Sequence, residues 1–138
     1  MKYHLFGFQA DVDQAATRDW YARSAGWDCD CAHCRNFLSI AGRRALPSPV
    51  LAAVDELGIP PEKPTYVCEM HPDGDGLRYQ FSYRVAGRVL QENANAAPYG
   101  ARFCHEPYPY GAPGFPEPHV DLAFELTLPW TLDEPMGG

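Results

Sequence analysis

The sequence is short of basic residues and has no long hydrophobic run. It carries 11 lysines and arginines against 18 aspartates and glutamates, which gives a formal net charge of −7 at pH 7. Sequence-independent binding to nucleic acid, or binding to an anionic lipid surface, needs clustered Lys and Arg, so the charge balance argues against both partners. No stretch approaches the roughly 18 consecutive apolar residues of a membrane-spanning helix. We therefore expect neither a nucleic-acid partner nor a membrane partner.

The N-terminal segment also lacks the features of a secretory signal. Its apolar residues are interrupted by His4 and Gly7, acidic residues follow at once, and no small-residue cleavage site is present. The cysteines number five, and three of them, Cys29, Cys31 and Cys34, fall within six residues. A secreted disulfide framework spreads its cysteines along the chain, whereas a tight cluster fits reduced thiols or a metal. We therefore expect a cytoplasmic location.

Length and composition predict a single domain of class α+β. The chain has 138 residues, of which 46 % are hydrophobic and 21 % charged, so a packed core is expected. Helical signals occupy about residues 1–60, strand signals about 65–130, and a long proline-rich loop about 91–118. The predicted architecture is an antiparallel sheet of about four or five strands, with two or three N-terminal helices packed on one face.

The helices are predicted from their boundary residues and apolar spacing. Ser48 and Pro49 are typical of a helix start, and Gly58 followed by Pro60 is typical of its end. A second helix is expected from the cysteine cluster to Ala41, with Gly42 as its stop. A third is expected over about residues 14–24, with an aspartate as its N-cap.

The strands are predicted from strict alternation of apolar and polar residues. Such alternation over residues 77–85 and 120–128 indicates strands with one buried and one solvated face. A shorter strand at 65–70 joins the first of these through a Gly/Asp turn. Ala86-Gly87 is predicted to be a tight turn with a strand returning from it, and within the long loop about residues 102–106 are expected to pair.

The strongest chemical signal is the cysteine cluster. Zinc prefers four nitrogen or sulfur ligands in a tetrahedron, and the Cys31-x2-Cys34 spacing delivers two thiolates to one ion. Cys29 is a candidate third ligand. The fourth ligand must come from elsewhere, because His33 between two ligands is expected to point away. Cys104 and His105 in the long loop are the preferred donors, followed by Cys68 and His71.

Two other interpretations of the cluster remain open. A Cys-x2-Cys pair at a helix N-terminus also fits a thiol–disulfide protein, with Cys31 attacking and Cys34 resolving. No strand is predicted immediately before it, which that motif requires. The cysteines are alternatively plain packing residues near a helix start.

A surface cleft is predicted where the long loop meets the cysteine cluster. Loops of this length within compact domains commonly carry function. The candidate ligand-binding residues are those beside the cluster and the loop aromatics, namely Arg35, Asn36, Tyr99, Tyr108 and Tyr110. No catalytic residue is assigned, because the sequence contains no recognisable nucleophile or phosphate-binding motif.

Several of these segments resemble a group of small bacterial proteins. The shared features are Cys-x2-Cys-Arg-Asn-Phe near the N-terminus, Leu-Gly-Ile after a short helix, a Tyr-rich strand, and a closing Leu-Pro-Trp-x-Leu-Asp-Glu-Pro. The resemblance implies a bacterial, cytoplasmic origin and a shared fold, and it carries no activity over to this chain.

The expected function is accordingly that of a small non-enzymatic binding or interaction protein. Its clustered cysteines, Cys29, Cys31 and Cys34, are called the cysteine knuckle below, and this knuckle is expected to bind zinc in a structural role. The alternative is a thiol–disulfide redox protein using Cys31 and Cys34. The expected partner is an unidentified small molecule or protein, and the chain is expected to be a monomer or a homodimer.

Overall fold

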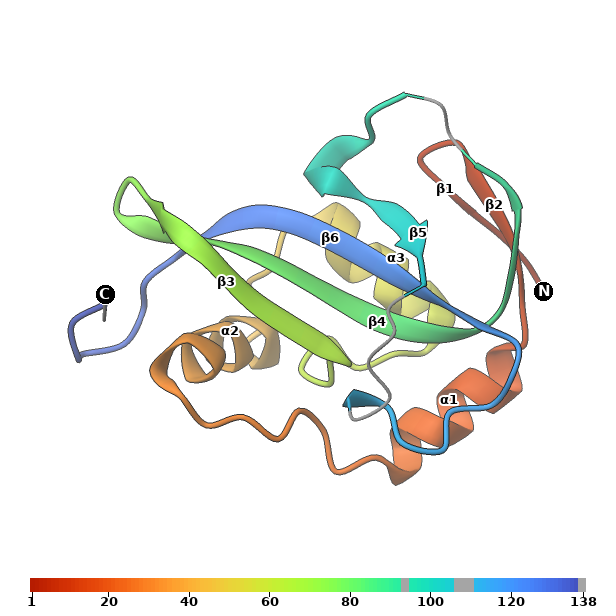
Figure 1. Ribbon diagram of the computed structural model, residues 1–138, viewed down its shortest axis with the longest axis horizontal. Coiled ribbons are helices and arrows are strands. Elements are labelled where there is room, and N and C mark those ends of the chain that lie inside the picture. The colour runs from red at the N-terminus through yellow and green to blue at the C-terminus, as the bar shows by residue number, and fades with distance from the viewer. Residues whose placement is uncertain (93–94, 106–110, 137–138) are drawn as a thin grey trace.

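The structure is an α+β fold built on one antiparallel sheet (Figure 1). The computed structural model describes residues 1–92, 95–105 and 111–136. Within these ranges the helices are α1 (Gln14–Arg23), α2 (Ala32–Gly42), α3 (Ser48–Leu57) and the short 3-10 turn η1 (Pro98–Gly100). The strands are β1 (Lys2–Leu5), β2 (Phe8–Val12), β3 (Tyr66–Asp73), β4 (Gly76–Gln91), β5 (Arg102–Cys104) and β6 (His119–Pro129). The predicted fold class is confirmed, with one strand more than expected.

Strand β4 is the longest strand of the sheet and pairs with three others. It has 16 residues, of which residues 76–86 pair with β6 along one edge, and β5 adds to the far side of β6. The other edge of β4 is shared, because β3 pairs with its first half and β2 pairs with residues 87–91. The first twelve residues are thereby joined to the same sheet as the C-terminal half of the chain.

The turn predicted at Ala86-Gly87 is wrong, because β4 runs straight through it. Gly87 lies opposite Val12 of β2, and a Cβ atom at Gly87 would stand 2.1 Å from the carbonyl oxygen of Asp11. The glycine therefore permits two strands to approach closely, which is a second common use of glycine within a strand. The residues expected to return from the turn instead continue β4 to Gln91.

The N-terminal hairpin was not predicted from the sequence. β1 and β2 pair across a two-residue turn, Phe6-Gly7, whose φ angles of 46° and 86° suit the twist of a hairpin. Tyr3 and Ala10, opposite each other in the pairing, are fully buried. The hairpin adds two strands, and the count rises by only one because the two strands expected on either side of Gly87 are the single strand β4.

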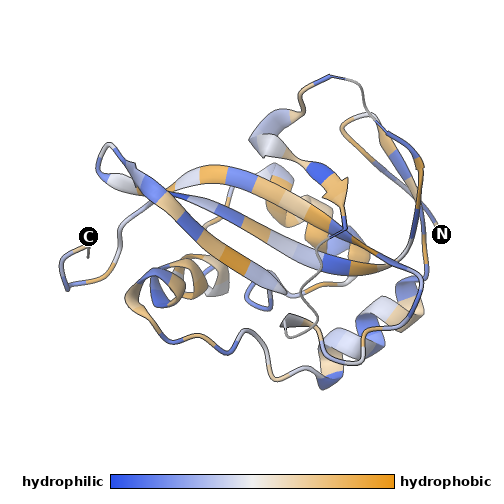
Figure 2. Cartoon of the chain, viewed as in Figure 1, coloured by the Kyte–Doolittle hydropathy of each residue, from blue (hydrophilic) through white to orange (hydrophobic). Residues whose placement is uncertain are grey.

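Helices α2 and α3 cover one face of the sheet, here called the inner face. Phe37 of α2 packs on Phe81 and Tyr79 of β4, with ring centroids 4.7 and 5.8 Å away. Tyr3 of β1 donates a hydrogen bond of 3.1 Å to the carbonyl oxygen of Ala53 in α3. The alternating orange and blue bands along β4 and β6 in Figure 2 show the period-two pattern that directs these apolar side chains inward.

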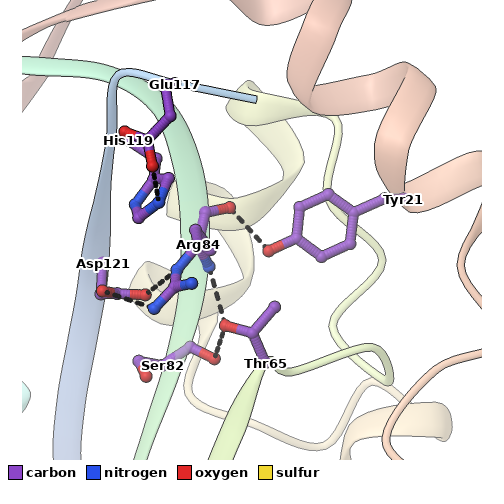
Figure 3. Close-up of polar contacts among 7 residues, drawn as sticks. All are labelled: Tyr21, Thr65, Ser82, Arg84, Glu117, His119 and Asp121. Atoms are coloured by element: carbon purple, nitrogen blue, oxygen red, sulfur yellow. Dashed lines mark hydrogen bonds and ion pairs between the residues drawn. The ribbon is translucent and has the colours of Figure 1, made fainter. Parts of the chain in front are cut away.

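The opposite, outer face of the sheet is only partly solvated, contrary to expectation. Ser82, Arg84 and Asp121 lie on this face and are 5 % exposed or less. The guanidinium of Arg84 donates to the carboxylate of Asp121, with Nε 3.0 Å from Oδ1 (Figure 3). A chain segment covers this region, since Gly111 lies so close to Thr65 that a Cβ atom would stand 2.0 Å from the Thr65 carbonyl oxygen.

Side-chain hydroxyls complete the edge of β4 between β3 and β2. The backbone N–H of Arg84 donates to Thr65 Oγ1 at 2.9 Å, and that of Ala86 donates to Thr17 Oγ1 at 3.1 Å. Tyr21 of α1 donates its hydroxyl to the carbonyl oxygen of Arg84 at 2.7 Å (Figure 3). These contacts satisfy backbone groups that no neighbouring strand reaches, and they dock α1 against the sheet.

Candidate metal centre

The three clustered cysteines lie at the junction between α1 and α2. Cys29 is in the connecting segment, Cys31 is the N-cap residue of α2, and Cys34 is in its first turn. The start of this segment is held by Lys63, whose ammonium donates to the carbonyl oxygens of Tyr21 and Ser24 at the end of α1. Such capping of a helix C-terminus fixes the direction in which the chain leaves it.

The three sulfur atoms are close enough to hold one metal ion. All three Sγ atoms lie within 4.8 Å of one another, and those of Cys29 and Cys31 are 3.3 Å apart. In a tetrahedral zinc site with Zn–S bonds of about 2.3 Å, neighbouring sulfur atoms are about 3.8 Å apart. The observed range brackets that value, so small side-chain movements bring the three thiols onto three corners of the tetrahedron.

The surroundings distinguish the three thiols electrostatically. The pKa of Cys29 is lowered, first by the backbone N–H of Cys31 and then by hydrogen bonds from the Cys31 and Cys34 side chains. Burial raises the pKa of Cys34, partly offset by the indole N–H of Trp27, which donates to its sulfur at 3.2 Å. An N–H donor to a ligand sulfur also disperses the charge of a metal-bound thiolate. The N-terminus of α2 favours negative charge at the same place.

Cys104 and His105, predicted to provide the fourth ligand, are not part of the cluster. Among the residues that the structure describes, the three N-terminal cysteines are the only group of three or more candidate ligands whose atoms all lie within 4.8 Å of one another. Cys104 ends β5 opposite Asp121, which places it on the outer face of the sheet, whereas α2 covers the inner face. β3, which contacts Trp27 and His33 beside the cluster, is separated from β5 by β4 and β6, so the width of the sheet keeps Cys104 away from the knuckle.

His33 points away from the cluster, as expected. Its Nδ1 lies 3.4 Å from a carboxylate oxygen of Glu69, and its ring packs against Trp130 at a centroid distance of 6.1 Å. The backbone carbonyl of His33 accepts a hydrogen bond of 2.7 Å from the hydroxyl of Tyr79. Burial raises the pKa of Tyr79 to about 12, so this hydroxyl keeps its proton at neutral pH.

Arg35 and Asn36, predicted to bind a ligand, make contacts within the protein. Arg35 donates to the carbonyl oxygen of Asp30 at 2.9 Å and to the carboxylate of Glu134 at 2.6 Å. Asn36 is fully buried, and its carbonyl oxygen accepts from the N–H and hydroxyl of Thr131. Both residues thus tie the C-terminal segment to the first turns of α2.

The three loop tyrosines predicted to bind a ligand are not gathered at the cluster by any described contact. Tyr99 lies in η1 with a φ angle of 58°, beside β6, and it packs partly against the core. Tyr108 and Tyr110 fall outside the residues that the structure describes.

A groove with a cavity volume of about 750 Å³ lies directly beside the cysteines. Trp20 and Trp27 line it, together with Cys29 from the cluster and Gly111 and Pro113 from the long loop. A cleft between the loop and the knuckle was predicted from the sequence, but a role for either tryptophan in it was not. The position of Trp27, two residues before Cys29, was the available signal.

Comparison with known proteins finds no matching family model, curated protein or solved structure. Within the described ranges, no helix is both long enough and apolar enough to span a membrane. The case for a function therefore stands on the cysteine cluster and its surroundings.

Proposed function

We propose that this protein is a small non-enzymatic binding protein whose N-terminal cysteine knuckle holds a zinc ion on Cys29, Cys31 and Cys34. The observation that supports it is the gathering of three sulfur atoms within 4.8 Å at the start of α2. Thiolate ligands favour zinc among the common divalent metals, and the tetrahedral geometry suits the sulfur spacing.

The expected role of the ion is to stabilise the fold locally. The segment between α1 and α2 has no regular secondary structure, and two of the ligands lie in or next to it. An ion bridging Cys29 to Cys34 fastens this segment onto α2. Because the ion binds the folded chain in preference to the unfolded chain, it raises the free energy of unfolding by about 2.7 kcal/mol at 100 times its Kd.

Metal content per chain is the decisive measurement. The full chain is purified under reduction and without chelator, and zinc is counted by elemental mass spectrometry. One zinc per chain is expected. Serine at Cys29, Cys31 or Cys34 should abolish binding at equimolar zinc, whereas Cys68→Ser and Cys104→Ser are matched controls that should keep the ion. Folded protein that takes up no zinc, or loses it equally in the controls, contradicts the proposal.

A thiol–disulfide function is the second candidate, and one observation favours it. The Sγ atoms of Cys29 and Cys31 are 3.3 Å apart, and the pKa of Cys29 is lowered. This geometry favours Cys29 as the attacking thiol and Cys31 as its partner over the pair Cys31 and Cys34 expected from the sequence, because Cys34 is buried and its pKa is raised. A redox protein predicts that Cys31→Ser traps mixed disulfides on Cys29. A zinc site predicts loss of metal instead.

A further inference from the structure

Within the described part of the chain the cysteine cluster offers three metal ligands, and a groove opens beside one of them. The three sulfur atoms would fill three corners of a zinc tetrahedron, and no other described His, Cys, Asp or Glu joins them. Sites with three protein ligands leave the fourth position to water or to an incoming ligand. Cys29 belongs both to the cluster and to the wall of the groove. A molecule in the groove therefore lies next to a ligand of the proposed metal.

The walls of the groove present flat apolar surface. Both indole N–H groups are already engaged, since Trp20 donates to the carbonyl oxygen of Pro113 at 3.0 Å and Trp27 donates to Cys34 Sγ at 3.2 Å. Trp20 is 7 % exposed and its ring packs on Tyr21 and Phe115, so the half-buried ring of Trp27 is the indole surface that remains for a ligand. Tryptophan rings bind planar or apolar groups by stacking and by edge contacts.

Close packing fixes one wall in place. A Cβ atom at Gly111 would lie 3.3 Å from the Trp27 ring and 2.0 Å from the carbonyl oxygen of Thr65. The loop therefore approaches the Thr65 carbonyl oxygen as only a glycine allows, and this approach brings it against the Trp27 ring. Trp27 also packs edge-on against Tyr66, at a centroid distance of 6.5 Å. A wall held from both sides is preorganised, which lowers the entropic cost of binding.

We propose that the groove binds a small thiol with an aromatic or similarly flat apolar body, and that its sulfur takes the fourth position on the metal. This rests on the proposed zinc function. On binding, the thiol replaces a metal-bound water and gives its proton to that water, so one hydronium ion leaves as one Zn–S bond forms and one Zn–O bond breaks. Zinc favours the exchange because it deprotonates a coordinated thiol and prefers sulfur to a neutral oxygen ligand.

The test uses the full chain loaded with Co²⁺, which reports its ligands by absorption. Benzyl mercaptan is the probe, and benzyl alcohol is its matched control without sulfur. Benzyl mercaptan should raise the sulfur-to-cobalt charge-transfer absorption by about one third, because a fourth thiolate joins three. Benzyl alcohol at the same concentration should leave the spectrum unchanged.

Two variants at Trp27 and one at Ala25 test the groove itself. Trp27→Phe and Trp27→Ala both lose the N–H bond to Cys34, but only the second removes the ring. Trp27→Ala should weaken benzyl mercaptan binding about tenfold relative to Trp27→Phe. 2-Mercaptoethanol, which has no ring, should bind both equally. Ala25 is exposed on the groove wall, so Ala25→Trp should block benzyl mercaptan without disturbing the core.

The outcomes separate the two proposals. A chain that binds neither Co²⁺ nor Zn²⁺ overturns the zinc function and this inference with it. A chain that binds Co²⁺ but shows no spectral change with benzyl mercaptan keeps the metal centre and overturns the thiol ligand. Benzyl mercaptan binding that is insensitive to both Trp27→Ala and Ala25→Trp shows coordination without the groove, which also overturns the inference.

Discussion

The Asn36 side chain is the main polar link between α2 and the C-terminal segment, and its removal has a calculable cost. Its amide nitrogen donates to Tyr79 Oη at 3.2 Å and to the Pro129 carbonyl oxygen at 3.1 Å. Its carbonyl oxygen accepts from the N–H and hydroxyl of Thr131 at 2.8 and 2.9 Å. The four bonds together fix the point at which the chain leaves β6.

Asn36→Ala should lower the free energy of unfolding by about 2–3 kcal/mol. A typical hydrogen bond contributes about 1 kcal/mol net, which gives about 4 kcal/mol for four bonds as an upper figure. The cost is smaller here because Thr131 and Pro129 are exposed and can bond to water once the segment moves. Urea unfolding followed by circular dichroism measures the change, which corresponds to a fall in Tm of roughly 6–12 °C. Proteolysis of residues 131–136 should accelerate in parallel.

Asn36→Asp tests the same contacts by pH. The aspartate keeps the acceptors for Thr131, but it faces the Pro129 carbonyl oxygen with an oxygen and is buried, so its pKa in the folded state should be raised. The loss of stability relative to wild type is then full above that raised pKa, and it diminishes as the pH falls towards about 4, where the protonated carboxyl donates again. Ser39→Ala on the same helix is the control, expected within about 0.5 kcal/mol of wild type. A loss below about 1 kcal/mol for Asn36→Ala would refute the argument.

Three further outcomes follow from the structure. Asp121→Ala should lower the free energy of unfolding, measured in urea, by about 3–5 kcal/mol, because it leaves the Arg84 guanidinium buried without its carboxylate partner. The double variant Arg84→Met/Asp121→Leu should lower it less, because no charge remains buried. Equal losses for the two variants would contradict this reasoning. Gly87→Ala should destabilise more than Gly74→Ala, since both glycines have positive φ angles but only at Gly87 would the new Cβ atom stand 2.1 Å from a backbone oxygen. Similar melting temperatures for the two variants would count against the close approach. Zinc affinity should fall as pH falls, because the thiols must lose their protons to bind the ion, and Cys34, whose pKa is raised, should be the last to lose its proton. Titration of the protein with zinc in weak buffer should therefore release protons. Zinc binding without proton release would argue against thiolate ligands.

Boundary residues and alternation were the reliable sequence signals. Helix α3 was predicted from Pro49 with Ser48 as its N-cap, whereas it starts at Ser48 with Pro47 at the N-cap position, and it ends as predicted where Gly58 adopts a φ angle of 74°. β6 extends the predicted strand by one residue at each end. These features are local, since they depend on which residues are neighbours along the chain. Gly87 was misread because the same residue type serves a turn and a close approach between strands, and only the partner strand distinguishes the two uses.

The candidate site was predictable as far as it is local. Cys29, Cys31 and Cys34 meet because they are near in sequence and the last two share the start of a helix. The predicted position of Cys104 failed because it depends on the order of the strands in the sheet, which puts β5 and β3 on opposite sides of β4 and β6. The groove was missed for a related reason, since it joins Trp20 and Trp27 to loop residues more than 80 positions away.

The hydroxyl contacts along β4 have a consequence for which substitutions the sheet tolerates. Between the start of β3 and the end of β2, the edge of β4 carries backbone groups that no strand pairs, and Thr17, Tyr21 and Thr65 are buried there. Thr65 and Thr17 accept from the N–H groups of Arg84 and Ala86, and the Tyr21 hydroxyl donates to the Arg84 carbonyl oxygen. Valine matches threonine in shape but cannot accept a hydrogen bond, so Thr17→Val or Thr65→Val would each leave one buried N–H group without an acceptor, at a cost of about 1–3 kcal/mol. The three hydroxyls therefore stand in for a missing stretch of strand along this edge.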